Sequence, residues 1–78
     1  MTSRISTAEL VALLDAPREW VLESREHGTL RYALLMAASY RAEGVRGHQL
    51  ATADGALRID EEQLIELLRV TGLGRKRR

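Results

Sequence analysis

Residues 7–30 read TAELVALLDAPREWVLESREHGTL, and this stretch carries several helix-boundary signals in close succession. Ser6 and Glu9 have the spacing of a capping box, in which each side chain bonds the backbone amide of the other residue at a helix start. Pro17 suits the first turn of a second helix, and Gly28 suits the position just after its end. The stretch therefore predicts two short helices, over residues 6–15 and 17–27, joined by a tight turn.

The rest of the chain predicts two more helices and a β-hairpin. Residues 32–38 read YALLMAA, an unbroken run of apolar residues that form helices readily, and they predict a helix over 30–43. Asp60 and Gln63 have capping-box spacing and predict a last helix over 60–71.

The hairpin is predicted over residues 48–59. Asp54-Gly55 is a two-residue turn signal, and pairing across it places Leu50 opposite Ile59 and Thr52 opposite Leu57. The alternative for this segment is a loop, because Ala and Gln are poor strand formers.

Size and composition limit the classes of protein that fit. The chain has 78 residues, 45% of them hydrophobic, with no Cys. That length allows one small domain, for which oligomerisation is a common source of extra stability. Without Cys there is no disulfide framework, which favours a reducing compartment such as the cytoplasm. No apolar run reaches the length of a membrane span, and the N-terminus lacks a signal-peptide pattern.

Charge is unevenly distributed. The chain carries 12 Lys or Arg and 11 Asp or Glu, for a net charge of +1, yet Arg75, Lys76, Arg77 and Arg78 supply four of the positive charges. Residues 1–74 are therefore at −3. We expect a single domain over 1–73 and a basic tail over 74–78, which fits contact with phosphates or an acidic partner. The alternative is a solvated tail with no specific role.

Catalysis and metal binding have little support in the sequence. His27 and His48 lie in different predicted elements, and neither has a second His at ligand spacing. The serines lack a nucleophile motif, and no glycine-rich loop precedes a helix with Lys-Ser or Lys-Thr. We expect a protein that is not an enzyme, with no cofactor, no metal and no small-molecule substrate.

Residues 7–30 and 56–68 together resemble the excisionase and MerR-type winged helix-turn-helix DNA-binding families. The matching positions in the first block are Thr7, Leu13, Leu14, Val21, Gly28 and Leu30, with Arg18 at the family's basic position, and the second block reads ALRIDEEQLIELL. The resemblance implies a mainly α winged helix-turn-helix fold. It would have four helices (about 6–15, 17–27, 30–43 and 60–71), with the hairpin at about 48–59 as the wing.

The resemblance also implies a function. The helix over 17–27 would enter a DNA major groove, and dimerisation or cooperative binding would place two copies on two half-sites. The protein would be a bacterial or phage transcription regulator or recombination directionality factor that binds double-stranded DNA in the nucleoid. The expected DNA-binding residues are Arg18, Arg25, Arg31, Arg46, Arg58, Arg75, Lys76, Arg77 and Arg78.

A second hypothesis rests on the apolar helix over 30–43. A helix that is apolar on nearly all sides must be covered on nearly all sides, and in a small chain a partner can supply the cover. The protein would then be a non-enzymatic interaction module, a small inhibitor or adaptor, with Tyr32, Leu35, Met36 and Tyr40 at the interface. The alternative for this helix is the central core helix of a monomer.

Overall fold

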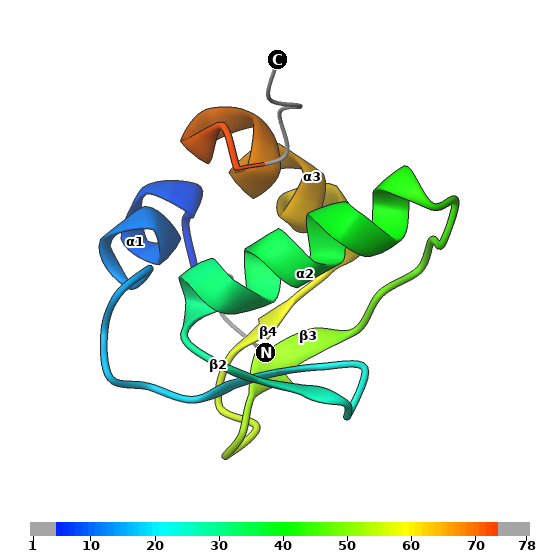
Figure 1. The fold of residues 1–78 in the computed structure, drawn as a ribbon. Helices are drawn as coiled ribbons and strands as arrows, with labels where there is room; N and C mark the ends of the chain where they lie inside the picture. The colour runs from blue at the N-terminus through cyan, green and yellow to red at the C-terminus, as the bar shows by residue number, and fades with distance from the viewer. Residues whose placement is uncertain (1–4, 74–78) are drawn as a thin grey trace.

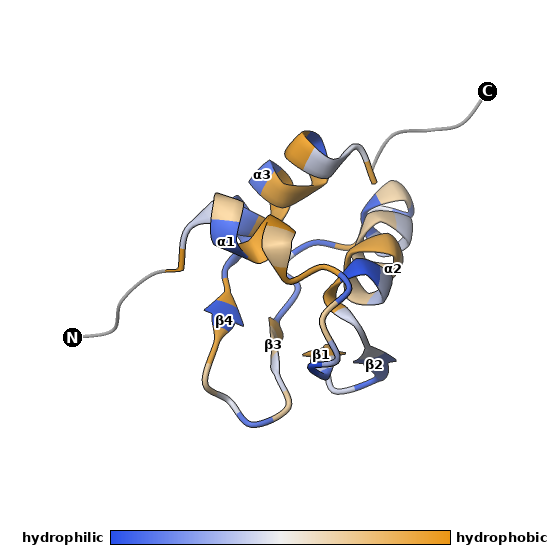
Figure 2. Cartoon of the chain, turned by 90° about the vertical axis from the view of Figure 1, so that its left-hand side faces the viewer, coloured by the Kyte–Doolittle hydropathy of each residue, from blue (hydrophilic) through white to orange (hydrophobic). Residues whose placement is uncertain are grey.

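The computed structural model describes residues 5–73, and this part of the chain holds three helices and four short strands. In chain order the elements are α1 (Thr7–Ala12), β1 (Trp20–Leu22), β2 (Glu26–Gly28), α2 (Leu30–Ala42), β3 (Leu50–Thr52), β4 (Arg58–Ile59) and α3 (Glu61–Thr71). Figure 1 shows the path of the chain through these elements. The strands form one sheet in the order β2-β1-β3-β4 (Figure 2), and every neighbouring pair is antiparallel.

The structure has two layers, with all three helices on the same side of the sheet (Figure 2). Side chains alternate between the two faces of a strand, and the burial of β1 and β3 follows that alternation. Trp20, Leu22 and Leu50 point toward the helices and are buried, whereas Val21 and Ala51 point to the other face and are only half-buried. One face of the sheet therefore contributes to the core, and the other is not covered by any helix.

Helix α2 is the central helix of the core. Leu30, Ala33, Leu34 and Ala37 recur at helical spacing and are fully buried. Thr29 caps the start of the helix, and its hydroxyl accepts a hydrogen bond from the Tyr32 amide at 3.2 Å. The alternative of a core helix is the one that the structure favours for this segment.

The prediction of a helix over residues 17–27 is wrong, because this segment forms the β1–β2 hairpin. The physical reason lies in Trp20 and Leu22, which are both fully buried. Two residues that are two positions apart share one face of a strand but point to nearly opposite sides of a helix. A strand buries both side chains, and it leaves Val21 between them on the open face.

Gly28 is likewise not a helix cap. It is the last residue of β2, and a Cβ built on it would lie 2.8 Å from Cδ2 of Tyr32. Its lack of a side chain therefore gives the Tyr32 ring room to approach the strand. In the sequence this packing role cannot be told apart from a cap, because both require a small residue after a polar segment.

The predicted capping signals are mostly confirmed. The Ser6–Glu9 capping box is complete, although α1 ends at Ala12 rather than near residue 15. Asp60 caps α3 by accepting a hydrogen bond from the Gln63 amide at 2.9 Å. The Gln63 side chain does not return to the cap, however, and instead donates to the backbone oxygen of Ile5 at 2.7 Å.

The hairpin predicted over residues 48–59 is present with the predicted pairing of Leu50 and Ile59. It is not a free wing, because β3 also pairs with β1. The predicted fold class, a mainly α winged helix-turn-helix with four helices, is therefore wrong. The chain has an α+β arrangement in which two hairpins share one sheet. The predicted tail over 74–78 lies outside the described residues.

Candidate binding surfaces

The arginines predicted to bind DNA come from different elements of the fold, and two of them pair with carboxylates. Arg18 precedes β1 and pairs with Asp54 in the β3–β4 turn, at 3.4 Å between Nη2 and Oδ2. Arg31, at the start of α2, forms a two-pronged pair with Asp15, both contacts being 2.8 Å. That pair lowers the pKa of the Asp15 carboxyl and raises the pKa of Arg31. Both arginines are therefore already occupied by carboxylates of the same chain.

The remaining predicted arginines that the structure describes lie in three other segments of the chain. Arg25 lies in the β1–β2 turn, close enough to Glu26 for its charge to help lower the pKa of that carboxyl. Arg46 lies in the loop before β3 and donates to the backbone oxygen of Arg41 at 3.0 Å. Arg58 lies on β4. The other predicted DNA-binding residues, Arg75, Lys76, Arg77 and Arg78, fall outside the described residues.

The net charge of the described body opposes DNA binding through it. Residues 5–73 contain seven arginines and eleven aspartates or glutamates, which gives a net charge of −4. Duplex DNA presents a dense line of phosphates, so a body with this charge is repelled unless its cations are concentrated on one face. The predicted recognition helix that would have supplied such a face is not formed.

The four residues predicted as a protein interface are split by the structure. Tyr32 and Leu35 are exposed, at 39% and 45%, whereas Met36 and Tyr40 are half-buried against the core. The hydroxyls of Tyr40 and Tyr32 donate to the two oxygens of the Glu26 carboxylate, at 2.7 and 2.8 Å. These bonds lower the pKa of the Glu26 carboxyl and raise those of both tyrosines. The cluster joins α2 to β2, which is a structural role.

The two histidines lie in different parts of the fold. His27, on β2, has its Nδ1 atom 2.8 Å from Oε2 of Glu19. His48 is buried beside Tyr40, with 5.8 Å between the ring centroids, and its Nδ1 atom lies 3.8 Å from Oε2 of Glu23. Neither ring nitrogen of His48 forms a hydrogen bond within residues 5–73.

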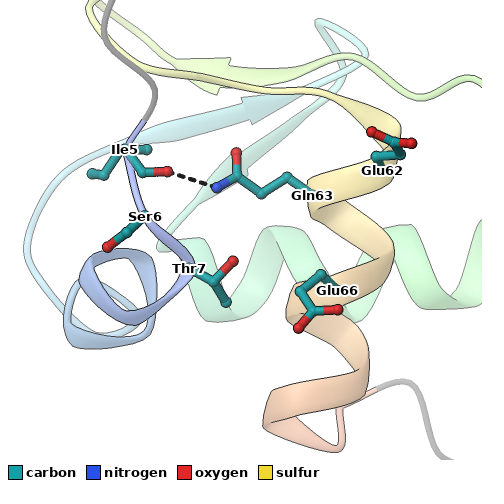
Figure 3. A pocket seen from close by; sticks show the side chains of 6 residues that line it. All are labelled: Ile5, Ser6, Thr7, Glu62, Gln63 and Glu66. Atoms are coloured by element: carbon teal, nitrogen blue, oxygen red, sulfur yellow. Dashed lines mark hydrogen bonds between the residues drawn. The ribbon is translucent and has the colours of Figure 1, made fainter.

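One surface hollow lies between the start of α1 and α3 (Figure 3). It has a volume of about 490 Å³ and is lined by Ile5, Ser6, Thr7, Glu62, Gln63 and Glu66. The Gln63 side chain bridges from α3 to the Ile5 carbonyl, and Glu62 and Glu66 stand on either side of it along α3. Glu66 is paired with Arg69 at 2.6 Å. Carboxylate and hydroxyl side chains line the hollow. Oε1 of Gln63 has no hydrogen-bond partner among the described residues, but it is buried and does not face solvent.

Another hollow is a groove on the uncovered face of the sheet. Its volume is about 330 Å³, and it is lined by Val21, Ser24, Gln49, Leu50, Ala51, Thr52, Ala53, Gly55 and Arg58. Strand pairing places four residues in one row across the sheet, in the order His27, Val21, Ala51 and Arg58. The groove follows β3, with small apolar side chains as its floor and Arg58 on the β4 side.

The polar groups of this sheet-face groove have few partners of their own. Arg58 is the only charged residue among those that line it, and within residues 5–73 it forms no ion pair. In the same part of the chain, the side chains of Ser24 and Gln49 have no hydrogen-bond partner. The backbone N–H of Gln49, by contrast, donates to the Glu23 carboxylate at 2.7 Å. The groove thus combines an apolar floor with uncommitted donors.

Comparisons with protein-family models, with curated proteins and with solved structures found no match to this chain. None of the helices within residues 5–73 is long and apolar enough to cross a membrane. The same residues contain no group of three or more His, Asp or Glu side chains arranged to hold a metal ion.

Sequence reasoning found only part of the sheet-face groove. The predicted pairing of Leu50 with Ile59 places Ala51 and Arg58 together on the opposite face of the hairpin, and the structure has them there. Val21 was missed because residues 17–27 read as a helix. The signal available in the sequence was the short run Trp20-Val21-Leu22, which is apolar and partly β-branched but too short to show a period of two.

Proposed function

We propose that this protein is a non-enzymatic protein-interaction module that binds its partner on the uncovered face of the sheet. The observation that carries the proposal is the sheet-face groove, because an antiparallel sheet with one solvated face normally presents polar side chains there. Here Val21, Ala51 and Ala53 form an apolar floor instead. This placement replaces the earlier hypothesis of an interface on α2, whose apolar side is largely used in the core.

A DNA-binding function, the other hypothesis from the sequence, has less support from the described residues. It would rest on the basic tail and on three dispersed arginines, Arg25, Arg46 and Arg58, around a body of net charge −4. DNA binding is therefore one of the outcomes that the test distinguishes. The lack of Cys supports action in a reducing compartment, such as the bacterial cytoplasm.

The test compares two variants that carry the same substitution on opposite sides of the molecule. Ala51→Gln places a longer polar side chain on the floor of the groove, and Ala8→Gln makes the same change at an exposed position of α1. Both should keep the thermal stability of the wild-type chain. Proteins retained from a cell lysate are quantified on wild-type and on each variant.

The proposal expects at least one protein to be retained by wild-type and Ala8→Gln, and to be depleted about tenfold or more on Ala51→Gln, as for a central contact of an interface. Retention that is equal on all three chains, or no retained protein, would overturn it. A parallel incubation with genomic duplex fragments at two salt concentrations examines DNA. Selection of particular fragments that Ala51→Gln leaves unchanged would favour the DNA-binding hypothesis instead.

A further inference from the structure

The charge and the uncommitted donors of the sheet-face groove define which partner it fits. This inference rests on the proposed function and specifies the chemistry of the bound segment. We infer that the groove binds an extended protein segment with small apolar side chains and one acidic side chain, whose carboxylate contacts Arg58.

The preference for small apolar side chains follows from the strand register. Ala51 lies between Val21 on β1 and Arg58 on β4, so the floor beside the guanidinium is made of small side chains. Neighbouring strands are about 4.8 Å apart, so an extended chain lying along β3 covers this floor and keeps within reach of β4. Side chains that alternate along such a chain would point alternately to the floor and to solvent.

The preference for one acidic side chain in the bound segment follows from charge complementarity. Two carboxylates of the β1–β2 hairpin region already have partners: Glu19 contacts His27 at 2.8 Å, and Glu23 accepts a hydrogen bond from the Gln49 backbone N–H. Asp54, in the turn beyond the groove, pairs with Arg18 and also accepts hydrogen bonds from Thr52 and Ala56. Arg58 thus has no acidic partner within residues 5–73, and a guanidinium is best matched by a carboxylate.

Two neutral side chains of the groove can also donate hydrogen bonds to the bound segment. The Ser24 hydroxyl and the Gln49 amide group lie at the end of the groove where the β1–β2 turn approaches β3, and Glu23 of that turn donates its backbone N–H to the Gln49 carbonyl at 2.9 Å. Both side chains can donate to a backbone carbonyl or a polar side chain of the bound segment. Arg58 would therefore bind the acidic side chain in one part of the groove, and Ser24 and Gln49 would bind neutral polar groups in another part.

The test uses three peptides of the pattern Ala-Val-Ala-X-Ala-Val-Ala and the full-length protein. The first has X = Glu and an amidated C-terminus, the second has X = Gln and an amidated C-terminus, and the third has X = Gln and a free C-terminal carboxylate. Binding is measured by nuclear magnetic resonance titration of the backbone amides, which also shows where each peptide binds. The variants are Arg58→Gln and Arg69→Gln, which remove the same charge from the sheet face and from α3.

The Glu peptide is expected to shift the amides of Val21, Ala51 and Arg58, and to bind about fivefold to tenfold more tightly than the amidated Gln peptide. Arg58→Gln should abolish this preference and Arg69→Gln should keep it, which separates the groove from the basic tail that both variants retain. Tighter binding of the third peptide than of the first would assign the groove to a chain terminus and overturn the choice of an acidic side chain.

The docking surface and its preference for an acidic side chain are tested separately by these peptides. If the Glu and Gln amidated peptides bind equally and shift the sheet-face amides, the docking surface stands and the acidic preference is wrong. If no peptide shifts these amides at millimolar concentration, the docking surface itself is wrong, and the proposed function falls with it.

Discussion

The two hairpins of this sheet are built by different means. In the β3–β4 hairpin the turn is stabilised by its own residues: Gly55 has a φ of +77°, and the Asp54 carboxylate accepts hydrogen bonds from the Thr52 hydroxyl at 2.6 Å and the Ala56 amide at 3.0 Å. In the β1–β2 hairpin the turn contains Glu23 and Ser24, both with positive φ, at 56° and 58°. Neither residue type favours that conformation, which costs roughly 1–2 kcal/mol per residue.

The β1–β2 turn has one backbone hydrogen bond of its own, from the Arg25 N–H to the Leu22 carbonyl at 3.0 Å, and its other contacts come from elsewhere in the chain. The Glu23 backbone N–H donates to the Gln49 carbonyl at 2.9 Å, and the Gln49 amide donates back to the Glu23 carboxylate at 2.7 Å. On the next strand Glu26 accepts both tyrosine hydroxyls from α2. One hairpin therefore carries its own turn chemistry, and the other depends on the neighbours that it packs against.

The largest expected effect comes from removing the core contact of the β1–β2 hairpin. Trp20→Ala should destabilise the protein by about 3–5 kcal/mol, because the indole is fully buried and a cavity would remain. Val21→Ala, on the open face of the same strand, should cost less than about 1 kcal/mol. Urea unfolding followed by circular dichroism measures both. Equal losses for the two variants would show that β1 is not held through its inner face.

The next largest effect is expected in the β3–β4 hairpin. Thr52 is buried, its hydroxyl donates to Asp54, and it accepts the Leu57 amide at 3.1 Å. Thr52→Val should therefore cost about 1–2 kcal/mol, through the unpaired Leu57 N–H and the lost turn bond. In a double-mutant cycle with Asp54→Ala, the two losses should be less than additive. Strict additivity would mean that the turn does not act as a unit.

A pair of glycine exchanges should have opposite signs in the two turns. Ser24→Gly should stabilise the protein by about 1 kcal/mol, because glycine adopts positive φ without the steric cost. Gly55→Ala should destabilise it by about 1 kcal/mol, since an added Cβ meets no atom within 4 Å and only the backbone conformation is strained. Thermal melts of the two variants test this. A loss of stability in Ser24→Gly would show that the β1–β2 turn is not strained.

The same difference explains which parts of the fold could be predicted. The starts of all three helices and the Leu50–Ile59 pairing follow from residues close in sequence, and the structure has them. The β1–β2 hairpin was missed because Pro17 and Gly28 mimic helix boundaries, while the contacts of Glu23 and Glu26 join residues 26 and 14 positions apart. Val21 and Ser24, two of the nine residues that line the sheet-face groove, were lost with it, since Val21 reaches the open face only if β1 is a strand.

The smallest expected effect is a difference in acid sensitivity between the hairpins. Hydrogen bonds from Tyr40 and Tyr32 lower the pKa of Glu26 below its ordinary 4.5, and those from Thr52 and the Ala56 amide lower the pKa of Asp54 below 3.8. A lowered pKa in the folded state adds stability above the ordinary value, and this stability is lost as the pH falls through the folded-state pKa. Both carboxylates remain accessible to solvent, which keeps the effect small.

Acidification should therefore lower the melting temperature first through Glu26 and then, at lower pH, through Asp54. Glu26→Gln should flatten the upper part of the melting-temperature curve, just below pH 4.5, and Asp54→Asn should flatten the part below 3.8. Melts followed by circular dichroism across this range measure both slopes. Curves for Glu26→Gln that run parallel to wild-type would show that the tyrosine pair adds nothing to the folded state, and that the β1–β2 hairpin depends on Trp20, Leu22 and the Gln49 contacts alone.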